Sequence, residues 1–334
     1  MDIIYHDQSR IQEVRDFIEQ WNNTSKYLEV NSSGSTGEPK TIRLPKELMK
    51  RSAQRTLHFF SLKSAMNAGL CLSLTTIAGK MMVVRALLTE MQLHVFSVNQ
   101  SPLAEVDFPL DFNAMVPIQA LNTAENASEI HQEGLLLVGG SSLTENQFKR
   151  ISGFFHNCYQ TYGMTETASH VALRKISMNF QEPYNVLNGY SVSEKDGCLR
   201  IHCPDYTDKV ISTNDYAEIL SDQSFRIIGR KDFVINSGGI KVHPESIENR
   251  INTLFQITCL VVPVPDEHWG EIVGLVLTND AQIPTLETLK DSFLPAELPK
   301  KYTIIDSISY TENGKVNRQR MLEKLKNHAW QAIL

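Results

Sequence analysis

The order of apolar segments between residues 70 and 98 constrains the fold more than any other feature of this sequence. A strand-like stretch (Leu70–Leu74) is followed by a helical pattern over about Gly79–Met91 and by a second strand-like stretch (Leu93–Val98). This β-α-β order is typical of parallel strands. A further apolar strand, Leu135–Val138, ends at a Gly-Gly pair, where a ligand could approach the backbone closely. The region therefore predicts an α/β fold.

Periodic patterns extend this architecture in both directions. Ile11–Trp21 has the spacing of an amphipathic helix, and a second helical stripe follows Pro45 and runs to Phe60. Residues 184–228 consist of short strands broken by glycine, proline and asparagine, which predicts a β-rich subdomain. After Arg230 we expect a small α+β unit with two helices and two strands: Pro244–Asn252, Thr258–Val264, Ile272–Thr278 and Asn317–Leu325. We predict a large N-terminal domain of parallel and mixed sheets (1–230) and a small mobile C-terminal domain (231–334).

Composition narrows the function classes. With 334 residues, 42% hydrophobic and 21% charged, the chain is typical of a globular protein of about two domains. A formal net charge of −6 and the lack of a basic run give no reason to expect a nucleic-acid partner. No apolar run approaches the ~18 residues of a membrane span, and the N-terminus does not resemble a signal peptide. The five scattered cysteines fit reduced thiols better than a zinc site. We expect a soluble, cytoplasmic protein that does not contact membranes.

Residues 32–40 read Ser-Ser-Gly-Ser-Thr-Gly-Glu-Pro-Lys. Glycines allow such a loop to bend so that successive N–H groups point into one concavity, which suits the oxygens of a phosphate chain. The loop differs from the Walker type, because a proline precedes its lysine and a strand follows. A Ser/Gly-rich linker is the alternative interpretation. We predict a mobile phosphate-binding loop between two strands, with these binding residues: Ser33, Gly34, Ser35, Thr36, Gly37 and Lys40.

Four later segments carry groups that a nucleotide could use. In Tyr162–Glu166, an aromatic ring, a hydroxyl and a carboxylate could serve a base, a phosphate and Mg²⁺, although a turn before a capped helix has the same composition. Asp215 could accept both hydroxyls of a ribose, or it could simply form a turn. Arg230 could close on the same ribose or on phosphate, or lie in an exposed basic turn. Lys315 follows a glycine and could project its ammonium group, or be a solvated surface lysine.

The order and spacing of these five segments resemble the adenylate-forming superfamily, which contains acyl-CoA synthetases, nonribosomal-peptide adenylation domains and luciferases. The resemblance runs from about residue 30 to about residue 325. Besides the phosphate loop and Asp215, five segments match family motifs: Leu137–Ser141 (adenine side), Tyr162–Glu166 (Tyr-Gly-x-Thr-Glu), Gly229–Asp232 (hinge), Pro265–Glu271 (C-terminal signature) and Asn313–Arg318 (Gly-Lys-x-x-Arg).

The resemblance implies a two-step ligase that uses ATP, Mg²⁺ and coenzyme A. Lys315 would be the adenylation lysine, Thr165 and Glu166 would act with it, and Glu166 would bind the metal ion. Asp232 would be the hinge, and Gly238 and Gly239 would line the coenzyme A channel. Besides the phosphate loop, the implied nucleotide-binding residues are Gly139, Gly140, Ser141, Thr161, Tyr162, Gly163, Asp215 and Arg230.

The acid substrate is indicated by residues 72–87, which resemble the matching strand–helix region of o-succinylbenzoate–CoA ligases of menaquinone synthesis. Where many of those enzymes carry His, this chain has Thr76. That acid has two carboxylates, and Lys80 is the candidate for the one that does not react, although it could equally be a surface lysine at a helix start. Ser169 and His170 could also reach the pocket. The predicted acid-binding residues are therefore Thr76, Lys80 and His170.

The chain departs from the family pattern in two places. Only about 30 residues precede the phosphate loop, whereas family members carry a whole subdomain there. A pocket wall must then be rebuilt or supplied by a second subunit, as in a homodimer. The residue before the ribose aspartate is Asn214 rather than Gly, which is compatible with the turn. The alternatives are another aryl- or acyl-CoA ligase and a non-catalytic relative that binds nucleotide.

Overall fold

The computed structural model describes residues 1–31, 40–203, 210–278, 284–310 and 316–334. Contacts group the chain into two compact units. The first comprises residues 1–143, 147–191 and 202–211, and the second comprises residues 144–146, 192–201 and 212–334. The second unit therefore contains both the short strands after residue 191 and the C-terminal α+β region. The hinge near residue 230 concerns motion and stays a prediction.

A sheet that is parallel over most of its width forms the centre of the first unit. Its strands follow the order β1-β5-β4-β6-β7-β8-β9-β10. The first six strands in this order pair parallel, and β8, β9 and β10 pair antiparallel. A separate antiparallel pair, β2-β3, flanks the predicted phosphate loop. The strands of this unit are β1 (Ile3–Tyr5), β2 (Tyr27–Asn31), β3 (Thr41–Pro45), β4 (Asn67–Leu70), β5 (Gln92–Val95), β6 (Phe112–Met115), β7 (Leu135–Val138), β8 (Cys158–Gly163), β9 (His170–Lys175) and β10 (Tyr184–Val186).

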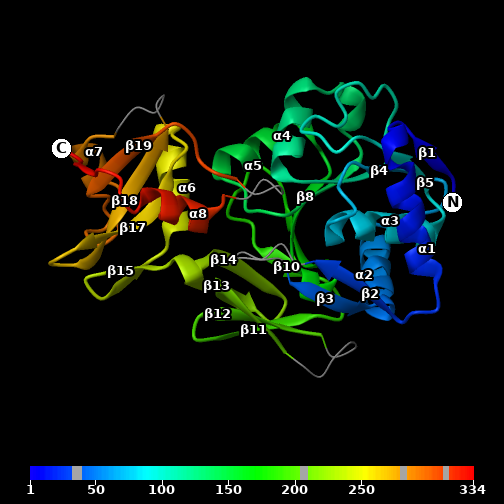
Figure 1. Ribbon diagram of the computed structural model, residues 1–334, viewed down its shortest axis with the longest axis horizontal. Helices are drawn as coiled ribbons and strands as arrows, with labels where there is room; N and C mark the ends of the chain where they lie inside the picture. The colour runs from blue at the N-terminus through cyan, green and yellow to red at the C-terminus, as the bar shows by residue number, and fades with distance from the viewer. Residues whose placement is uncertain (32–39, 204–209, 279–283, 311–315) are drawn as a thin grey trace. The chain divides into compact units, whose positions relative to one another are not determined.

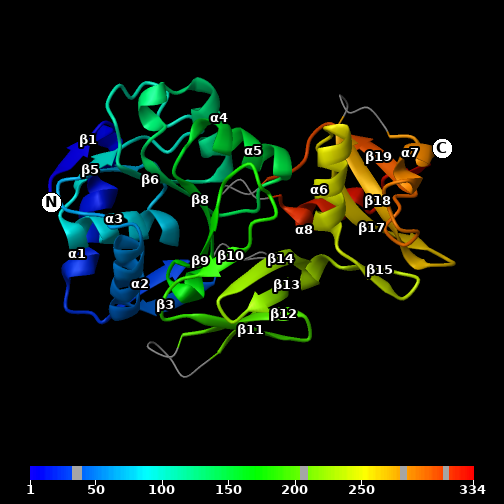
Figure 2. The ribbon, with the colours of Figure 1, turned by 180° about the vertical axis from the view of Figure 1, so that it is seen from behind.

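Helices cover both faces of this sheet. Figures 1 and 2 show α4 and α5 on one side of the parallel strands and α1, α2 and α3 on the other. The helices and 3-10 turns are η1 (Gln8–Arg10), α1 (Ile11–Asn22), α2 (Lys46–Phe59), α3 (Ile77–Thr89), α4 (Pro117–Asn126), η2 (Glu129–His131), α5 (Glu145–Phe154) and η3 (Thr165–Thr167). This arrangement confirms the α/β fold class, because parallel strands need helices on both faces to bury them.

The core of the first unit is apolar on both sides of the sheet. On one side, Phe148 and Ile151 of α5 pack with Leu136 and Val138 of β7 in one cluster of buried side chains. On the other side, α3 is buried around most of its circumference by a run of Met, Val and Ala side chains. An all-round apolar helix of this kind lies inside a protein rather than on its surface.

The strand predicted over Leu70–Leu74 was wrong in its extent. The structure has β4 at Asn67–Leu70, and the chain leaves the sheet immediately afterwards. The carbonyl groups of Leu70 and Leu72 accept hydrogen bonds from the Arg10 side chain. Cys71 is fully buried, with a free thiol. The apolar character of these residues thus reflects burial in a loop rather than sheet pairing.

The second unit contains an antiparallel sheet and a mixed sheet. The first follows the order β14-β13-β12-β11, and the second the order β16-β15-β18-β19-β20, with β17 also paired to β18. The strands are β11 (Ser191–Lys195), β12 (Cys198–His202), β13 (Ile211–Ser221), β14 (Ser224–Arg230), β15 (Ile235–Ser237), β16 (Ile240–Val242), β17 (Leu260–Asp266), β18 (Gly270–Thr278), β19 (Lys301–Ile305) and β20 (Gln331–Ala332).

Helices of the second unit bury apolar faces against its mixed sheet. The helical elements are η4 (Lys231–Phe233), α6 (Pro244–Phe255), α7 (Leu286–Lys290) and α8 (Arg318–Leu325). Ile247 and Ile251 of α6 pack with Val261 and Val273 of the sheet, and Met321 of α8 packs in a second cluster with Val262. The predicted small α+β region is confirmed: its four expected elements appear as α6, β17, β18 and α8, and the structure adds α7 and the strands β15, β16, β19 and β20. None of the described helices combines the length and apolar character that crossing a membrane requires.

Candidate nucleotide and acid sites

The carboxyl end of β7 carries the predicted adenine-side residues. Gly139 lies so close to β8 that an added Cβ atom would clash with the hydroxyl of Thr161. Gly140 has a φ of 96°, which favours glycine strongly. The structure thus brings Gly139 and Thr161 together at the carboxyl edge of parallel strands. This edge is where α/β sheets bind their ligands.

The Tyr162–Glu166 motif occupies the turn from β8 to β9. The Tyr162 ring packs edge-on against the Tyr184 ring, with 5.8 Å between the ring centroids. Thr165 and Glu166 lie in the short helix η3. Ala168 ends η3 with a φ of 61°, a conformation that costs free energy for any residue with a Cβ atom. Strained backbone therefore adjoins the predicted metal-binding carboxylate.

Directly after this turn, a buried polar cluster joins three elements of the first unit. The Arg85 side chain of α3 donates to the Ser169 hydroxyl (Nη2 to Oγ, 2.7 Å). His170 contacts Ser169 through Nδ1 at 3.3 Å and the Thr56 hydroxyl of α2 through Nε2 at 3.1 Å. We call these four side chains the Arg85 cluster. Of the three predicted acid-binding residues Thr76, Lys80 and His170, only His170 belongs to it.

Burial controls the charges in the Arg85 cluster. Desolvation lowers the pKa of Arg85 to about 10, so the guanidinium remains charged at neutral pH. Burial, and then the charge of Arg85, hold the pKa of His170 well below its usual value, so the imidazole is neutral. Among the described residues, no carboxylate lies within ion-pairing distance of Arg85, and its Nε atom is buried without a hydrogen-bond acceptor. The cluster therefore holds an uncompensated buried cation.

Sequence reasoning missed Arg85. A signal for it existed, because an arginine in the middle of an otherwise apolar helix is rarely buried without a reason. Its side chain is only 2% exposed, although it lies between Val84 and Ala86 in an apolar run of α3. The resemblance directed attention instead to the first turn of the same helix.

Thr76 and Lys80 occupy that first turn. Thr76 caps α3: its hydroxyl accepts from the Gly79 N–H at 3.2 Å and donates to the Ser73 carbonyl at 2.8 Å. The Lys80 ammonium lies 5.1 Å from the centre of the Phe17 ring of α1. Burial lowers the pKa of Lys80, and the nearby Glu13 carboxylate partly opposes this shift. Lys80 thus faces α1, on a different side of α3 from the Arg85 cluster.

The predicted ribose and hinge residues form a cluster within the second unit. Asp215 of β13 pairs in register with Arg230 of β14, and their side chains form an ion pair at 3.1 Å. The Arg230 guanidinium also binds Asp232 at 2.5 Å, and Asn214 donates to Asp232 at 2.9 Å. Burial lowers the pKa of Arg230, but its bond to Asp232 and the charge of Asp215 outweigh that effect and raise it. Arg230 is therefore fixed between two carboxylates.

The predicted coenzyme A loop is a two-residue hairpin between β15 and β16. Gly238 and Gly239 have φ values of 59° and 84°, as a turn with two left-handed residues requires. The Gly238 N–H donates to the Trp269 carbonyl at 2.9 Å, and an added Cβ atom on Gly238 would clash with the Trp269 ring. The two glycines thus bring the backbone close to an exposed indole.

Two predicted segments lie outside the described residues: the phosphate loop at Ser33, Gly34, Ser35, Thr36 and Gly37, and Lys315. Lys40 follows the first segment and is exposed. After the second segment, Arg318 forms an ion pair with Glu248 of α6 at 2.6 Å and donates to the Val261 carbonyl at 3.1 Å. The chain that follows Lys315 is therefore firmly attached to the second unit.

Glu166, as a single carboxylate, fits a magnesium ion that takes its other ligands from a bound nucleotide and water. Among the described residues, no group of three or more His, Cys, Asp and Glu side chains is placed to hold a metal ion. Mg²⁺ is usually bound by one or two carboxylates together with phosphate oxygens and water. A single carboxylate such as Glu166 beside a nucleotide is therefore a chemically sufficient protein ligand.

Comparison with known proteins supplies the family. No protein-family model matches the chain. A solved structure, an acyl-CoA synthetase (AMP-forming)/AMP-acid ligase II-like protein from Dyadobacter fermentans, is 30% identical, covers 96% of this chain and 95% of its own, and superposes with a TM-score of 0.61. The uncharacterized acyl-CoA ligase YhfT of Bacillus subtilis is 31% identical over 121 residues, which is 36% of this chain and 25% of YhfT.

A 2-succinylbenzoate–CoA ligase of Staphylococcus epidermidis is 26% identical over 249 residues, which is 64% of this chain and 51% of that enzyme. The chain thus spans about half the length, or less, of these curated relatives, whereas the Dyadobacter protein matches almost end to end. That full-length match agrees with the sheet order, the glycine-rich strand end and the Asp215–Arg230 pair. The chain accordingly belongs to the adenylate-forming superfamily of AMP-forming acyl-CoA ligases.

Proposed function

We propose that this protein activates a carboxylic acid with ATP and transfers the acyl group to coenzyme A, and that the preferred acid carries a second carboxylate, as o-succinylbenzoate does. The acid carboxylate would attack the α-phosphate of ATP, which releases pyrophosphate and forms an acyl-adenylate. The thiol of coenzyme A would then displace AMP and form a thioester. A role in menaquinone synthesis follows from that choice of acid.

The observation that carries the choice of a diacid is the uncompensated charge of Arg85. Burying a guanidinium without a counter-ion is costly, and the cost falls when an anion binds beside it. The Ser169 hydroxyl already holds Arg85 at 2.7 Å and offers a second donor to the same anion. A carboxylate that does not react is an anion of suitable size. Arg85 therefore joins Thr76, Lys80 and His170 as a proposed acid-binding residue.

The nucleotide roles rest on family membership and on the local geometry. Gly139, Gly140, Ser141, Thr161, Tyr162 and Gly163 would contact the base and phosphates, and Asp215 and Arg230 the ribose. The loop residues from Ser33 to Lys40 would hold the β- and γ-phosphates. Mg²⁺, bound through Glu166, would neutralise phosphate charge. The protein's contribution to such chemistry is mainly positioning and charge neutralisation.

Lys315 would bridge the attacking carboxylate and the α-phosphate in the first step only. Lys315→Ala should therefore lower adenylation about 10²–10³-fold, by analogy with the loss of one transition-state donor. Thioester formation from a supplied acyl-adenylate should be nearly unchanged. Pyrophosphate release and thioester yield, measured separately, check this expectation. Equal losses in both steps would contradict the assigned role.

A panel of acids tests the function as a whole. Purified protein is incubated with ATP, Mg²⁺, coenzyme A and one acid: o-succinylbenzoate, benzoate or a fatty acid. We expect acid-dependent pyrophosphate release and a coenzyme A thioester with the diacid above all. Thioesters formed only from the monoacids would support the second candidate, a general acyl-CoA ligase, which the similarity to YhfT favours. Nucleotide binding without pyrophosphate release from any acid would indicate a non-catalytic relative.

A further inference from the structure

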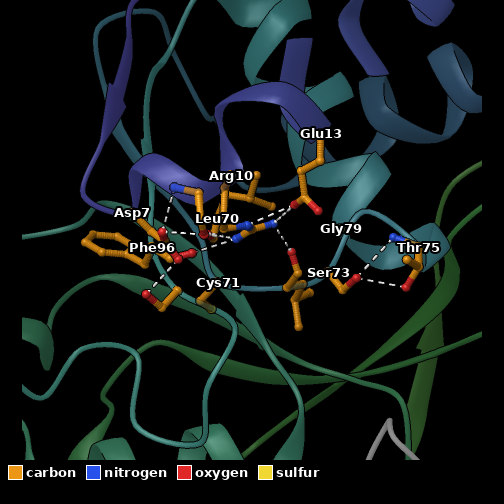
Figure 3. Close-up of polar contacts among 12 residues, drawn as sticks. Asp7, Arg10, Glu13, Leu70, Cys71, Ser73, Thr75, Gly79 and Phe96 are labelled. Atoms are coloured by element: carbon orange, nitrogen blue, oxygen red, sulfur yellow. Dashed lines mark hydrogen bonds and ion pairs between the residues drawn. The ribbon is translucent and has the colours of Figure 1, made fainter. Parts of the chain in front are cut away.

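Arg10 is buried at the junction of η1 and α1, where it is 5% exposed. Figure 3 shows its guanidinium among the backbone carbonyls of neighbouring segments. It donates to Phe96 O at 2.7 Å, to Leu72 O at 2.8 Å and to Leu70 O at 3.1 Å. Its Nε donates to the Glu13 carboxylate at 2.9 Å, and Nη2 contacts the same oxygen at 2.5 Å. All five N–H directions of the side chain therefore have an acceptor.

Two of the three carbonyls lie at the carboxyl ends of adjacent parallel strands. Leu70 is the last residue of β4, and Phe96 immediately follows β5. The Leu70 carbonyl also accepts the Phe96 N–H at 3.0 Å, and the planar guanidinium adds a donor to each of the three carbonyls. Arg10 therefore joins two strand ends at the edge of the sheet where ligands of α/β proteins bind.

The third carbonyl belongs to Leu72, which lies in the loop that leads from β4 to the predicted acid-binding residues. Within this loop the Thr75 N–H donates to the Ser73 hydroxyl at 3.2 Å, and Thr76 caps α3 while it binds Ser73 O. Gly79 packs against the same carbonyl so tightly that an added Cβ atom would clash with it. A displacement of Leu72 would thus be passed on to Thr76 and to the first turn of α3. We call residues 71–79 the acid loop.

The helix that Arg10 begins also faces Lys80. The Lys80 ammonium stands over the Phe17 ring of α1, and the Glu13 carboxylate raises its pKa against the effect of burial. Glu13 is at the same time the acceptor for Arg10. Arg10 thus binds the backbone of the acid loop, and Glu13 and Phe17 lie beside the Lys80 side chain that follows the loop.

We propose that Arg10 is a positioning residue for the acid substrate and that it acts through the acid loop. Arg10 holds the acid loop in place through Leu72 and aligns the Glu13 side chain beside Lys80. This role rests on the proposed ligase function. It assigns to the N-terminal helix an effect on acid binding and none on nucleotide binding.

The test compares Arg10→Lys with Val14→Ala. Lysine retains the charge but cannot serve three carbonyls and a carboxylate at once, so the fold survives while the acid loop loosens. Val14 is fully buried in the same helix and has no polar side-chain atom, so its truncation lowers stability while the hydrogen bonds of Arg10 stay in place. For Arg10→Lys we expect the KM for the acid to rise about tenfold and the KM for ATP to stay unchanged. For Val14→Ala we expect a lower Tm and an unchanged KM for both substrates.

Arg10→Lys would overturn the role if it raised both KM values equally, or if it behaved like Val14→Ala at matched loss of Tm. Arg10→Met provides a second measurement, with an expected rise in the acid KM at least as large as that of Arg10→Lys. Wild-type protein that releases no pyrophosphate with any acid would remove the proposed function, and this role with it. Active wild-type protein with an unperturbed Arg10→Lys variant would remove this role alone.

Discussion

Two cations on α3 compete for the role of binding the second carboxylate, and they point to different neighbours. Lys80 stands over Phe17 of α1, whereas Arg85 binds Ser169 at the start of β9. Positions five residues apart on a helix differ by about 140° in direction, so the two side chains cannot share one anion easily. The sequence favoured Lys80. Burial and the lack of a described carboxylate partner favour Arg85.

Substituting the two cations separately distinguishes them. Arg85→Met should raise the KM for a diacid about 10–100-fold, the value of one charged hydrogen bond, and leave the KM for a monoacid unchanged. Lys80→Met is the competing substitution, and because Lys80 faces α1 we expect it to raise the KM for the diacid only a few-fold. Steady-state kinetics with o-succinylbenzoate and benzoate provide the measurement. The opposite pattern would transfer the role to Lys80.

Glu248 links stability to pH. Burial raises its pKa to about 7, and the Arg318 charge opposes the shift; Glu245 and Cys259 are the other titratable groups nearby. Because the folded pKa lies above the unfolded value of 4.5, the protonated carboxyl stabilises the fold fully below about pH 4.5. That contribution is lost as the pH rises through about 7.

The expected result is a wild-type unfolding free energy that decreases between about pH 5 and about pH 8 more steeply than that of Glu248→Gln. Urea denaturation at several pH values measures both. Glu297→Gln, which removes a partner of Arg250 instead, should keep the wild-type slope. A Glu248→Gln variant with the wild-type slope would show that another group titrates.

The packing of the acid loop against the first turn of α3 depends on the close approach of Gly79 to the Ser73 carbonyl. Gly79→Ala forces a Cβ atom against the Ser73 carbonyl, and overpacking of this kind costs about 1–3 kcal/mol. We expect a lower Tm and a raised KM for the acid. Gly153 of α5 has no atom within 4 Å of an added Cβ atom, so Gly153→Ala should stabilise the protein by about 0.5–1 kcal/mol. Thermal unfolding of the two variants checks both signs, and a neutral Gly79→Ala would contradict this packing.

Helices and strands with a strong local sequence pattern were predictable, whereas contacts between residues far apart in the sequence were not. The strand Leu135–Val138 matches β7 in full, and Pro244 begins α6 as expected from its fixed φ. By contrast, the carbonyl at the end of β4, that of Leu70, accepts a hydrogen bond from Arg10, sixty residues away in the sequence. No periodicity encodes such a contact. The Arg85 cluster likewise joins α2, α3 and β9, so its geometry becomes visible only in three dimensions.

For the whole molecule, the central prediction is that residues 231–334 reorient between the two half-reactions. Arg230 is extended, and η4 begins at Lys231, which is a position that proline favours. Lys231→Pro would therefore be compatible with the observed backbone and restrict other conformations. We expect one half-reaction to be retained and the other to slow at least about tenfold, whereas Lys231→Ala should leave both nearly unchanged. Equal effects of Lys231→Pro on both would contradict a hinge here.

The reactivity of the buried Cys71 thiol reports how often the region around Arg10 opens. Desolvation raises the pKa of Cys71 to about 12, and its Sγ donates to Ala114 O at 3.3 Å. At neutral pH only about one molecule in 10⁵ would carry the reactive thiolate. Alkylation must therefore wait until the strand ends separate. The labelling rate of this single cysteine, followed by peptide mass spectrometry, reports how often that edge of the sheet opens and whether a bound acid keeps it shut.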